Sequence, residues 1–227
     1  LLAGGALTLS GNTLTFNDAV TLGVDTTITD AGDVTFNNTV DGAYDLTVIS
    51  GGTVSVNGLI GGTTALTSYT SSANVMTIAA AGGIATDNGA IDLTTDSLSI
   101  AGAINAGTGI VTLAPGTAGE TVSLGTEVAG SLSLTDAEID LITAGILRIG
   151  SSNAGSITFN DTISPANTGT LSLITGDEIL DLNPGVDVQV TNLAIQSVNG
   201  IANNEILETE VDTVAALNTT GGGIAIL

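Results

Sequence analysis

A seven-residue pattern recurs in the first part of the chain, as LTFNDAV at residues 14–20, VTFNNTV at residues 34–40 and VSVNGLI at residues 54–60. The step from one copy to the next is the same both times. The shared order is apolar, Thr or Ser, apolar, Asn, two further residues and then an apolar residue. A fixed period of about 20 residues is typical of solenoids, in which each repeat stacks on the next. The pattern predicts a parallel β-helix with one coil per repeat.

The pattern continues beyond residue 60, with less exact copies and less even spacing. The later copies are MTI (76–78), LSIAGAI (98–104), VSLGTEV (122–128) and ITFNDTI (157–163), and the last is nearly identical to the first. The number of residues between successive copies rises slightly at first and then sharply before residue 157. We therefore expect about ten coils of about 20–24 residues, with one irregular coil or an insertion around residues 136–150.

Stacked coils place equivalent side chains one above another. Phe16 and Phe36 should therefore stack, with Val56 in the next layer. The asparagines that follow these positions should form a ladder in which each amide binds the next layer, as in other stacked strands. These ladder residues are Asn17, Asn37 and Asn57.

The strands expected here are short, with turn residues between them and no helical period, which excludes a doubly wound α/β fold. A tandem β-sandwich remains the rival, and it predicts contacts across about 90–100 residues where a solenoid predicts about 20. Residues 204–212 concentrate acidic side chains, and the segment 204–217 suits either a short helix or an edge strand, of which we favour the strand. We expect residues 1–227 to form a single β-solenoid segment of a longer protein.

Composition limits the partners. The chain has 23 acidic residues, no Lys, no His and one basic residue, Arg148, for a net charge of −22. This charge opposes binding to nucleic acid and to anionic lipid surfaces, and it attracts cations. No apolar run is long enough for a transmembrane helix, so we expect no membrane insertion. The simplest interpretation is a solvated acidic surface, with specific cation binding as the alternative.

The residue types also limit catalysis. Without His, Lys or Cys, the chain has no Ser-His-Asp triad, no Schiff-base lysine and no thiol nucleophile. Paired carboxylates could still cleave glycosides, but only three side chains could hold a sugar, so we expect no enzyme, no catalytic residues and no cofactor-binding residues. The acidic pairs are Asp136 with Glu138 and Asp177 with Glu178, and the sugar-holding candidates are Arg148, Tyr44 and Tyr69.

Two corners carry oxygen ligands that suit calcium, at residues 30–33 (DAGD) and 87–89 (DNG). Neither has the spacing of an EF-hand, and Asp and Asn at corners usually bind their own backbone in Asx-turns. Calcium stays open as a cofactor, and no metal ligand is assigned.

A characteristic repeat style is found at residues 34–40, 46–48, 52–54, 82–86, 88–94, 147–150 and 157–159. This style resembles that of the filamentous-haemagglutinin-like adhesins, very large exoproteins of bacteria. The resemblance implies a right-handed parallel β-helix, secreted to the bacterial cell surface, that serves as a stalk or fibre. Other parts of such a chain would bind glycans or proteins of a host cell, a neighbouring cell or the matrix. The alternative is a subunit of a self-assembling extracellular filament that stacks end to end, with or without bridging cations.

Overall fold

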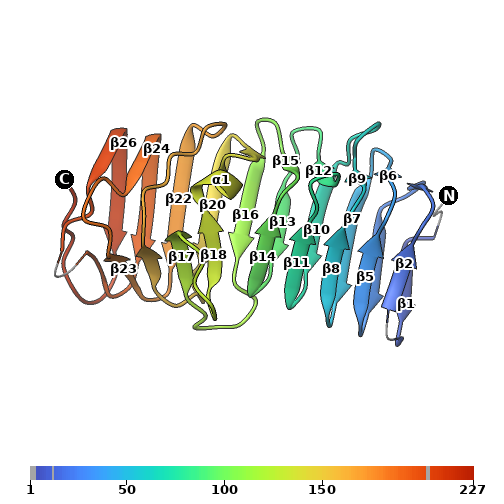
Figure 1. Ribbon diagram of the computed structural model, residues 1–227, viewed down its shortest axis with the longest axis horizontal. Helices are drawn as coiled ribbons and strands as arrows, with labels where there is room; N and C mark the ends of the chain where they lie inside the picture. The colour runs from blue at the N-terminus through green and yellow to red at the C-terminus, as the bar shows by residue number, and fades with distance from the viewer. Residues whose placement is uncertain (1–3, 12, 203–204) are drawn as a thin grey trace.

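The computed structural model, which describes residues 4–11, 13–202 and 205–227, is a parallel β-solenoid of about ten turns. Its coils stack along one long axis, with the two ends of the chain at opposite ends of the stack (Figure 1). Strands of successive coils pair in parallel, as the repeat predicts. Because these pairs join neighbouring repeats and not distant halves of the chain, the sandwich alternative is wrong.

One ten-stranded sheet runs the whole length of the stack. Its register gives the length of each coil, since Thr27 lies opposite Thr47 near the N-terminus while Arg148 lies opposite Ser172 further on. In order, its strands are β1 (Ala6–Leu9), β4 (Thr26–Asp30), β7 (Asp45–Ser50), β10 (Ser68–Ser72), β13 (Ile91–Thr94), β16 (Ile110–Ala114), β20 (Ile146–Ser151), β22 (Thr170–Thr175), β24 (Val188–Ser197) and β26 (Thr209–Asn218).

Three shorter sheets complete the coil. The first contains β14 (Ser97–Ile100), β11 (Val75–Ile78), β8 (Thr53–Val56), β5 (Asp33–Phe36) and β2 (Thr13–Phe16). The second contains β19 (Ile142–Thr143), β15 (Ala103–Asn105), β12 (Gly83–Ala85), β9 (Leu59–Ile60), β6 (Val40–Asp41) and β3 (Val20–Thr21). The third contains β18 (Leu132–Thr135), β17 (Val122–Gly125), β21 (Ile157–Phe159), β23 (Glu178–Asp181) and β25 (Gly200–Ile201).

The core is a continuous aliphatic column inside the coils. Strands alternate between inward and outward side chains, so Leu46 and Val48 of β7 are buried while Thr47 between them is partly exposed. Each inward Leu, Ile or Val packs on its counterparts in the coils above and below. This layer-to-layer burial explains why the chain forms a core with few aromatic side chains.

The two predicted ladders are confirmed. The rings of Phe16 and Phe36 stack with centroids 5.1 Å apart and planes at 4°, and Val56 lies opposite Phe36 in the next layer. Outside the core, the amide nitrogen of Asn37 donates to the side-chain oxygen of Asn17, and that of Asn57 donates to Asn37, both at 2.9 Å.

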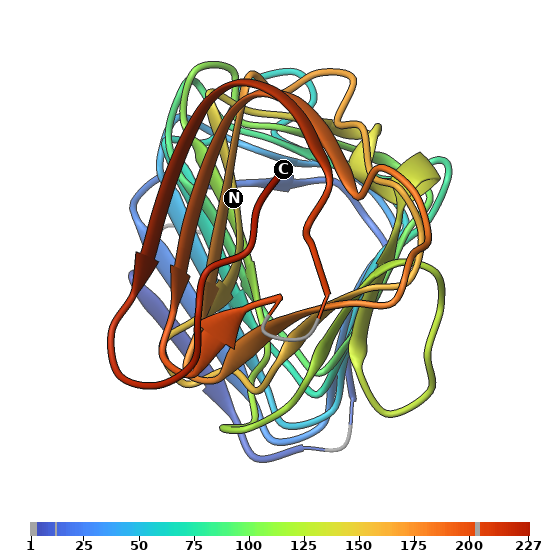
Figure 2. The same ribbon diagram turned by 90° about the vertical axis from the view of Figure 1, so that its left-hand side faces the viewer.

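One coil is irregular, as the long gap before residue 157 predicts. Thr112 lies opposite Arg148, and the extra residues between them form β17, β18 and the short helix α1 (Asp136–Ile139). The loop between β17 and β18 stands out from the outline of the stack (Figure 2). Where the chain leaves β17, Gly125 has φ +91°, and a Cβ there would lie 2.5 Å from the carbonyl oxygen of Asp161. The insertion therefore begins at a position that favours glycine.

This coil also corrects one predicted equivalence. The spacing in the sequence placed Val122 over Leu98, but Val122 pairs with Leu132 and with Ile157, and β17 belongs to a different sheet from β14. The inserted strand β18 pairs with β17 instead, and this extra strand is invisible to a simple count of spacing. The predicted step from Val122 to Ile157 is confirmed by the register.

The helix α1 closes the gap that the insertion leaves. It is held by a capping box, in which the backbone of Glu138 binds the side chain of Thr135 and the Glu138 carboxylate binds the Thr135 backbone. The other oxygen of Glu138 accepts the backbone N–H of Ile100 at 3.0 Å, at the end of β14. Because β14 is an edge strand of its sheet, the Glu138 carboxylate accepts a backbone N–H that a neighbouring strand would otherwise bind.

Residues 209–218 form β26, so the favoured strand interpretation of the acidic segment is confirmed there. Asn204, at which that segment begins, lies outside the described residues. Pro115, Pro165 and Pro184 all lie outside strands, as expected for residues that cannot donate to a sheet. Within the described part of the chain, the one helix spans four residues, and no helix has the length and apolar character needed to cross a bilayer.

Candidate functional site

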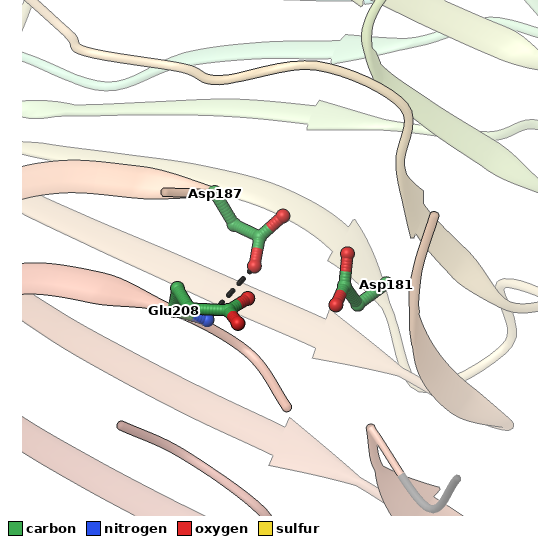
Figure 3. Close-up of side chains that lie close together, drawn as sticks. All are labelled: Asp181, Asp187 and Glu208. Atoms are coloured by element: carbon green, nitrogen blue, oxygen red, sulfur yellow. Dashed lines mark hydrogen bonds between the residues drawn. The ribbon is translucent and has the colours of Figure 1, made fainter. Parts of the chain in front are cut away.

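Three carboxyl groups meet inside the solenoid near its C-terminal end. Asp181 ends β23, Asp187 precedes β24, and Glu208 precedes β26 one coil further on. A carboxylate oxygen from each lies within 4.8 Å of the other two, and Figure 3 shows the three groups turned toward one another. We call Asp181, Asp187 and Glu208 the interior acidic cluster.

The strand register explains why Asp181 points inward. Ile179 and Asp181 occupy the two inward positions of β23, and Asp181 lies opposite Phe159, which itself lies opposite Leu124. An acidic residue therefore continues an inward column that is apolar in the preceding coils. Its Oδ1 accepts the backbone N–H of Asn183 at 2.8 Å, which turns the chain out of the strand.

Backbone pairing between coils holds the other two residues together. The N–H of Asp187 donates to the carbonyl of Glu208 at 2.8 Å. In return, the N–H of Glu208 donates to Oδ2 of Asp187 at 2.9 Å, the bond drawn in Figure 3. The cluster therefore spans two successive coils and is fixed by the same hydrogen bonds that stack them.

Two members of the cluster are buried, Glu208 is partly buried, and two carboxylate oxygens lack a partner. Asp187 is 0% exposed and Asp181 is 8% exposed. Oδ1 of Asp187 and Oε2 of Glu208 are buried without a hydrogen-bond partner. Burial, and then the neighbouring carboxyl groups of Asp181 and Glu208, raise the pKa of Asp187 to about 7, against the opposing effect of the Glu208 backbone N–H. The arrangement can bind either a proton or a cation.

The chain offers no basic side chain to balance this charge. Arg148 is its one basic residue, and it occupies an outward position of β20, between the inward Leu147 and Ile149. Its Nε has no hydrogen-bond partner. Any positive charge at the interior acidic cluster must therefore come from solution.

A surface pocket adjoins the cluster. Its volume is about 270 Å³, and Asp181 contributes to its wall. Glu205, which is exposed, lies on the same wall. The remaining lining residues are Leu182, Asn183 and Pro184. Asp181 is therefore the member of the cluster that borders this pocket.

The two corners with oxygen ligands that suit calcium bind neighbouring backbone and side-chain donors, in line with the expected preference of Asp and Asn for such bonds. Oδ1 of Asp30 accepts the N–H of Gly32 at 3.0 Å, which is an Asx-turn, and Oδ1 of Asp33 accepts the N–H of Thr53 in the next coil. At the second corner, Asn88 accepts both donors of Thr108. Among the described residues, neither corner belongs to a group of three clustered acidic ligands.

The acidic pairs considered for glycoside cleavage also hold the coil together. Asp136 accepts the N–H of Ser164 at 2.6 Å, and Glu138 caps α1 and β14 as described above. Asp177 accepts hydrogen bonds from Ser156 and Asn199 in the neighbouring coils. Its partner in the pair, Glu178, is the first residue of β23.

The three side chains considered for holding a sugar are dispersed. Tyr69 is 0% exposed and lies in the core, so it cannot contact a substrate at the surface. Tyr44 is exposed and precedes β7, while Arg148 lies in β20. The structure does not bring them together at one of the acidic pairs.

A larger hollow lies beneath the loop that joins β17 and β18. Its volume is about 680 Å³, and Asp96, Glu120 and Glu127 contribute to its wall. Burial, and then the adjacent Glu138, raises the pKa of Glu127. Asp96 is already satisfied by the backbone of Gly116 and by Thr117. This hollow is therefore less complete as an ion site than the interior acidic cluster.

The sequence did contain a signal for the cluster. Asp181 falls one coil length after Phe159, so the repeat places a charge at an inward position. Aligning the inward positions of successive coils would have marked this exception. The pairing of Asp187 with Glu208 follows from the same alignment, since they too are one coil length apart.

No protein-family model, no curated protein and no solved structure matches this chain. What the structure establishes is a β-helical repeat protein.

Proposed function

We propose that this chain is a stalk segment of a secreted bacterial cell-surface adhesin, where it holds another part of the protein at a distance. The observation that carries the proposal is the ten-stranded sheet, which runs unbroken along the stack, through the irregular coil as well. The repeat style of the sequence supports the adhesin context and the extracellular location. In this role, binding to cell-surface or matrix glycans and proteins belongs to other parts of the chain.

The geometry suits a spacer because length grows in equal steps. Neighbouring strands lie about 4.8 Å apart, so ten stacked strands extend about 45 Å. Each coil buries its aliphatic side chains on its neighbours, and stability is then a sum of coil and interface contributions. Outward Thr and Ser residues and the net charge of −22 keep the surface hydrated.

Removing one repeat tests the proposal. Deleting residues 34–53, one whole repeat that begins and ends at equivalent positions, should shorten the rod by one layer and leave it folded. In a surface-displayed fusion, the height of a terminal epitope should fall by about 4.8 Å per deleted coil. An epitope height that does not follow the number of coils would contradict the stalk.

A self-assembling filament is the second candidate. The outermost strands of the long sheet are β1 and β26, and apolar side chains are exposed at the β26 end, including Val214 (46%), Ile224 (50%) and Leu227 (76%). Outer strands of this kind can pair with another copy. Negative-stain microscopy separates the two candidates, because short discrete rods support the stalk and long fibres of uniform width support the filament.

A further inference from the structure

We propose that Asp181, Asp187 and Glu208 form a binding site for a divalent cation, with calcium as the best match, that ties the last coils of the solenoid together. The site goes beyond the stalk proposal, since it would act in the same way in a filament or in any other setting. Three independent observations carry it, and they concern distance, unsatisfied oxygens and charge.

The distances fit one ion. Calcium binds oxygen ligands at about 2.3–2.6 Å, so two oxygens on opposite sides of the ion lie about 4.8 Å apart. One carboxylate oxygen from each of the three residues meets this limit with respect to the other two. Without any change in the backbone, a single ion can therefore contact Asp181, Asp187 and Glu208 together.

The unsatisfied oxygens indicate that a partner belongs there. Asp187 is 0% exposed, and its Oδ1 is buried without a hydrogen bond although its Oδ2 binds the Glu208 backbone. Oε2 of Glu208 is likewise buried and unpartnered. Leaving such groups unsatisfied is costly, and a cation between them would satisfy both at once.

The charge requires an external partner. Three carboxyl groups share a site in which both aspartates are buried, and the single arginine of the chain occupies an outward position of a different strand. Buried charges are normally paired or bound to metal. Only a proton or a cation from solution can play that part here, and the two must compete.

The donor set selects the kind of ion. All three ligands are carboxylate oxygens, which suit calcium and magnesium, whereas zinc and copper prefer the nitrogen and sulfur ligands of His and Cys. The chain contains neither His nor Cys. Calcium accepts irregular sets of oxygens and bidentate carboxylates, while magnesium demands near-octahedral geometry. Asp181 also borders a surface pocket whose wall carries the exposed Glu205.

Calcium titration of the whole chain tests the site. The protein is first freed of divalent ions with a chelator. Calorimetry then follows calcium binding at physiological ionic strength and at pH about 8, above the raised pKa of Asp187. We expect saturable binding of one calcium per chain, weaker binding of magnesium, and a higher melting temperature with calcium. Lowering the pH to about 5 should weaken the binding.

Two variants and one control identify the ligands. Asp187→Asn keeps an oxygen that can accept the Glu208 backbone N–H but removes the charge. Glu208→Gln removes the charge in the next coil and keeps the length of the side chain. Asp18→Asn removes one charge from an exposed position in the first regular coil. Circular dichroism establishes that each variant is folded. The site requires that both cluster variants lose the saturable binding and the calcium-dependent melting shift, while Asp18→Asn keeps both.

Two results would overturn the proposal. Equal calcium uptake by wild type, Asp187→Asn and Asp18→Asn would mean that calcium merely screens a chain of net charge −22. Absence of calcium binding, together with a change in the pH titration on Asp187→Asn, would mean that the carboxyl groups share a proton and bind no cation.

Discussion

The first regular coils and the last coils of the solenoid differ in where a distinctive group of polar side chains lies. In the first coils this group lies outside the core, and in the last coils it lies inside. In the first coils, inward positions such as Phe36 and Val56 are apolar, and the Asn17–Asn37–Asn57 ladder lies outside. In the last coils, the inward position that follows Phe159 is Asp181, and the interior acidic cluster surrounds it. The two regions have the same strand geometry and almost the same coil length.

This difference shows that a solenoid can keep its architecture while one layer changes its chemistry. Each coil contacts only its neighbours, so an unfavourable group weakens the stack locally and leaves distant coils as they were. In the first coils, the buried Asp30 is satisfied by the backbone N–H of Gly32. In the last coils, Asp187 and Glu208 have buried carboxylate oxygens without a hydrogen-bond partner, which is costly unless a ligand compensates for it.

Removing an aromatic ring from the core should cause the largest loss of stability in either region. Phe36→Ala leaves a cavity between Phe16 and Val56 and should lower the free energy of unfolding by about 3–5 kcal/mol. Phe159→Ala should cost less, because a cavity beside Asp181 can admit water that solvates its carboxyl group. Urea unfolding followed by circular dichroism measures both. Equal losses would mean that the acidic neighbour does not alter the core.

Removing the charge at Asp187 should have a smaller effect, and one that depends on pH. Its raised pKa means that the stability conferred by the protonated carboxyl is fully present below 3.8 and is lost as the pH rises through about 7. Without divalent ions, Asp187→Asn should match wild type near pH 4 and exceed it by about 2–4 kcal/mol near pH 8.

Urea unfolding in chelator across this pH range measures the difference between the two proteins. Asp18→Asn is the control for the general repulsion among acidic residues, and its difference from wild type should change little with pH. A constant difference for Asp187→Asn would show that Asp187 is ionised at both ends of the range.

Breaking the outer ladder should have the smallest effect. Asn37→Ala removes the amide that binds Asn17 and the oxygen that accepts from Asn57. Because the ladder is exposed to water, the loss should be about 1 kcal/mol. Asn153→Ala is the matched control, since Asn153 is exposed and its side chain makes no hydrogen bond within the described part of the chain. A larger loss at Asn37 than at Asn153 in urea unfolding would establish the ladder as a stabilising feature.

Much of the fold could be predicted because each layer repeats its neighbour. The regular spacing was enough to place Phe36 on Phe16 and Asn37 on Asn17, since identical side chains in adjacent coils mark the register directly. The sequence spacing indicated where the irregular coil lies but did not predict the strands inside it. Its inserted strand, β18, pairs with β17 across a short loop, as Val122 with Leu132, and this spacing is much shorter than the period of the solenoid.

The interior acidic cluster was harder to predict for a different reason. Asp187 lies outside the strands, in a corner where acidic residues usually face solvent or bind their own backbone. Its burial depends on how the coil that carries Glu208 folds back over it. At the corner of residues 30–33, by contrast, the usual behaviour of acidic corner residues held, because Asp30 and Asp33 accept backbone N–H groups.

The irregular coil has a consequence for how such a protein can change. Thr112 and Arg148 pair in register across a far longer stretch of chain than the pairs of other coils. Closing the longer loop costs only about 0.5 kcal/mol more in chain entropy, because this cost grows with the logarithm of length. New loops can therefore be inserted on one side of a coil while the long sheet continues without a break on another side. Surface features can then evolve, or be grafted, without redesign of the rod.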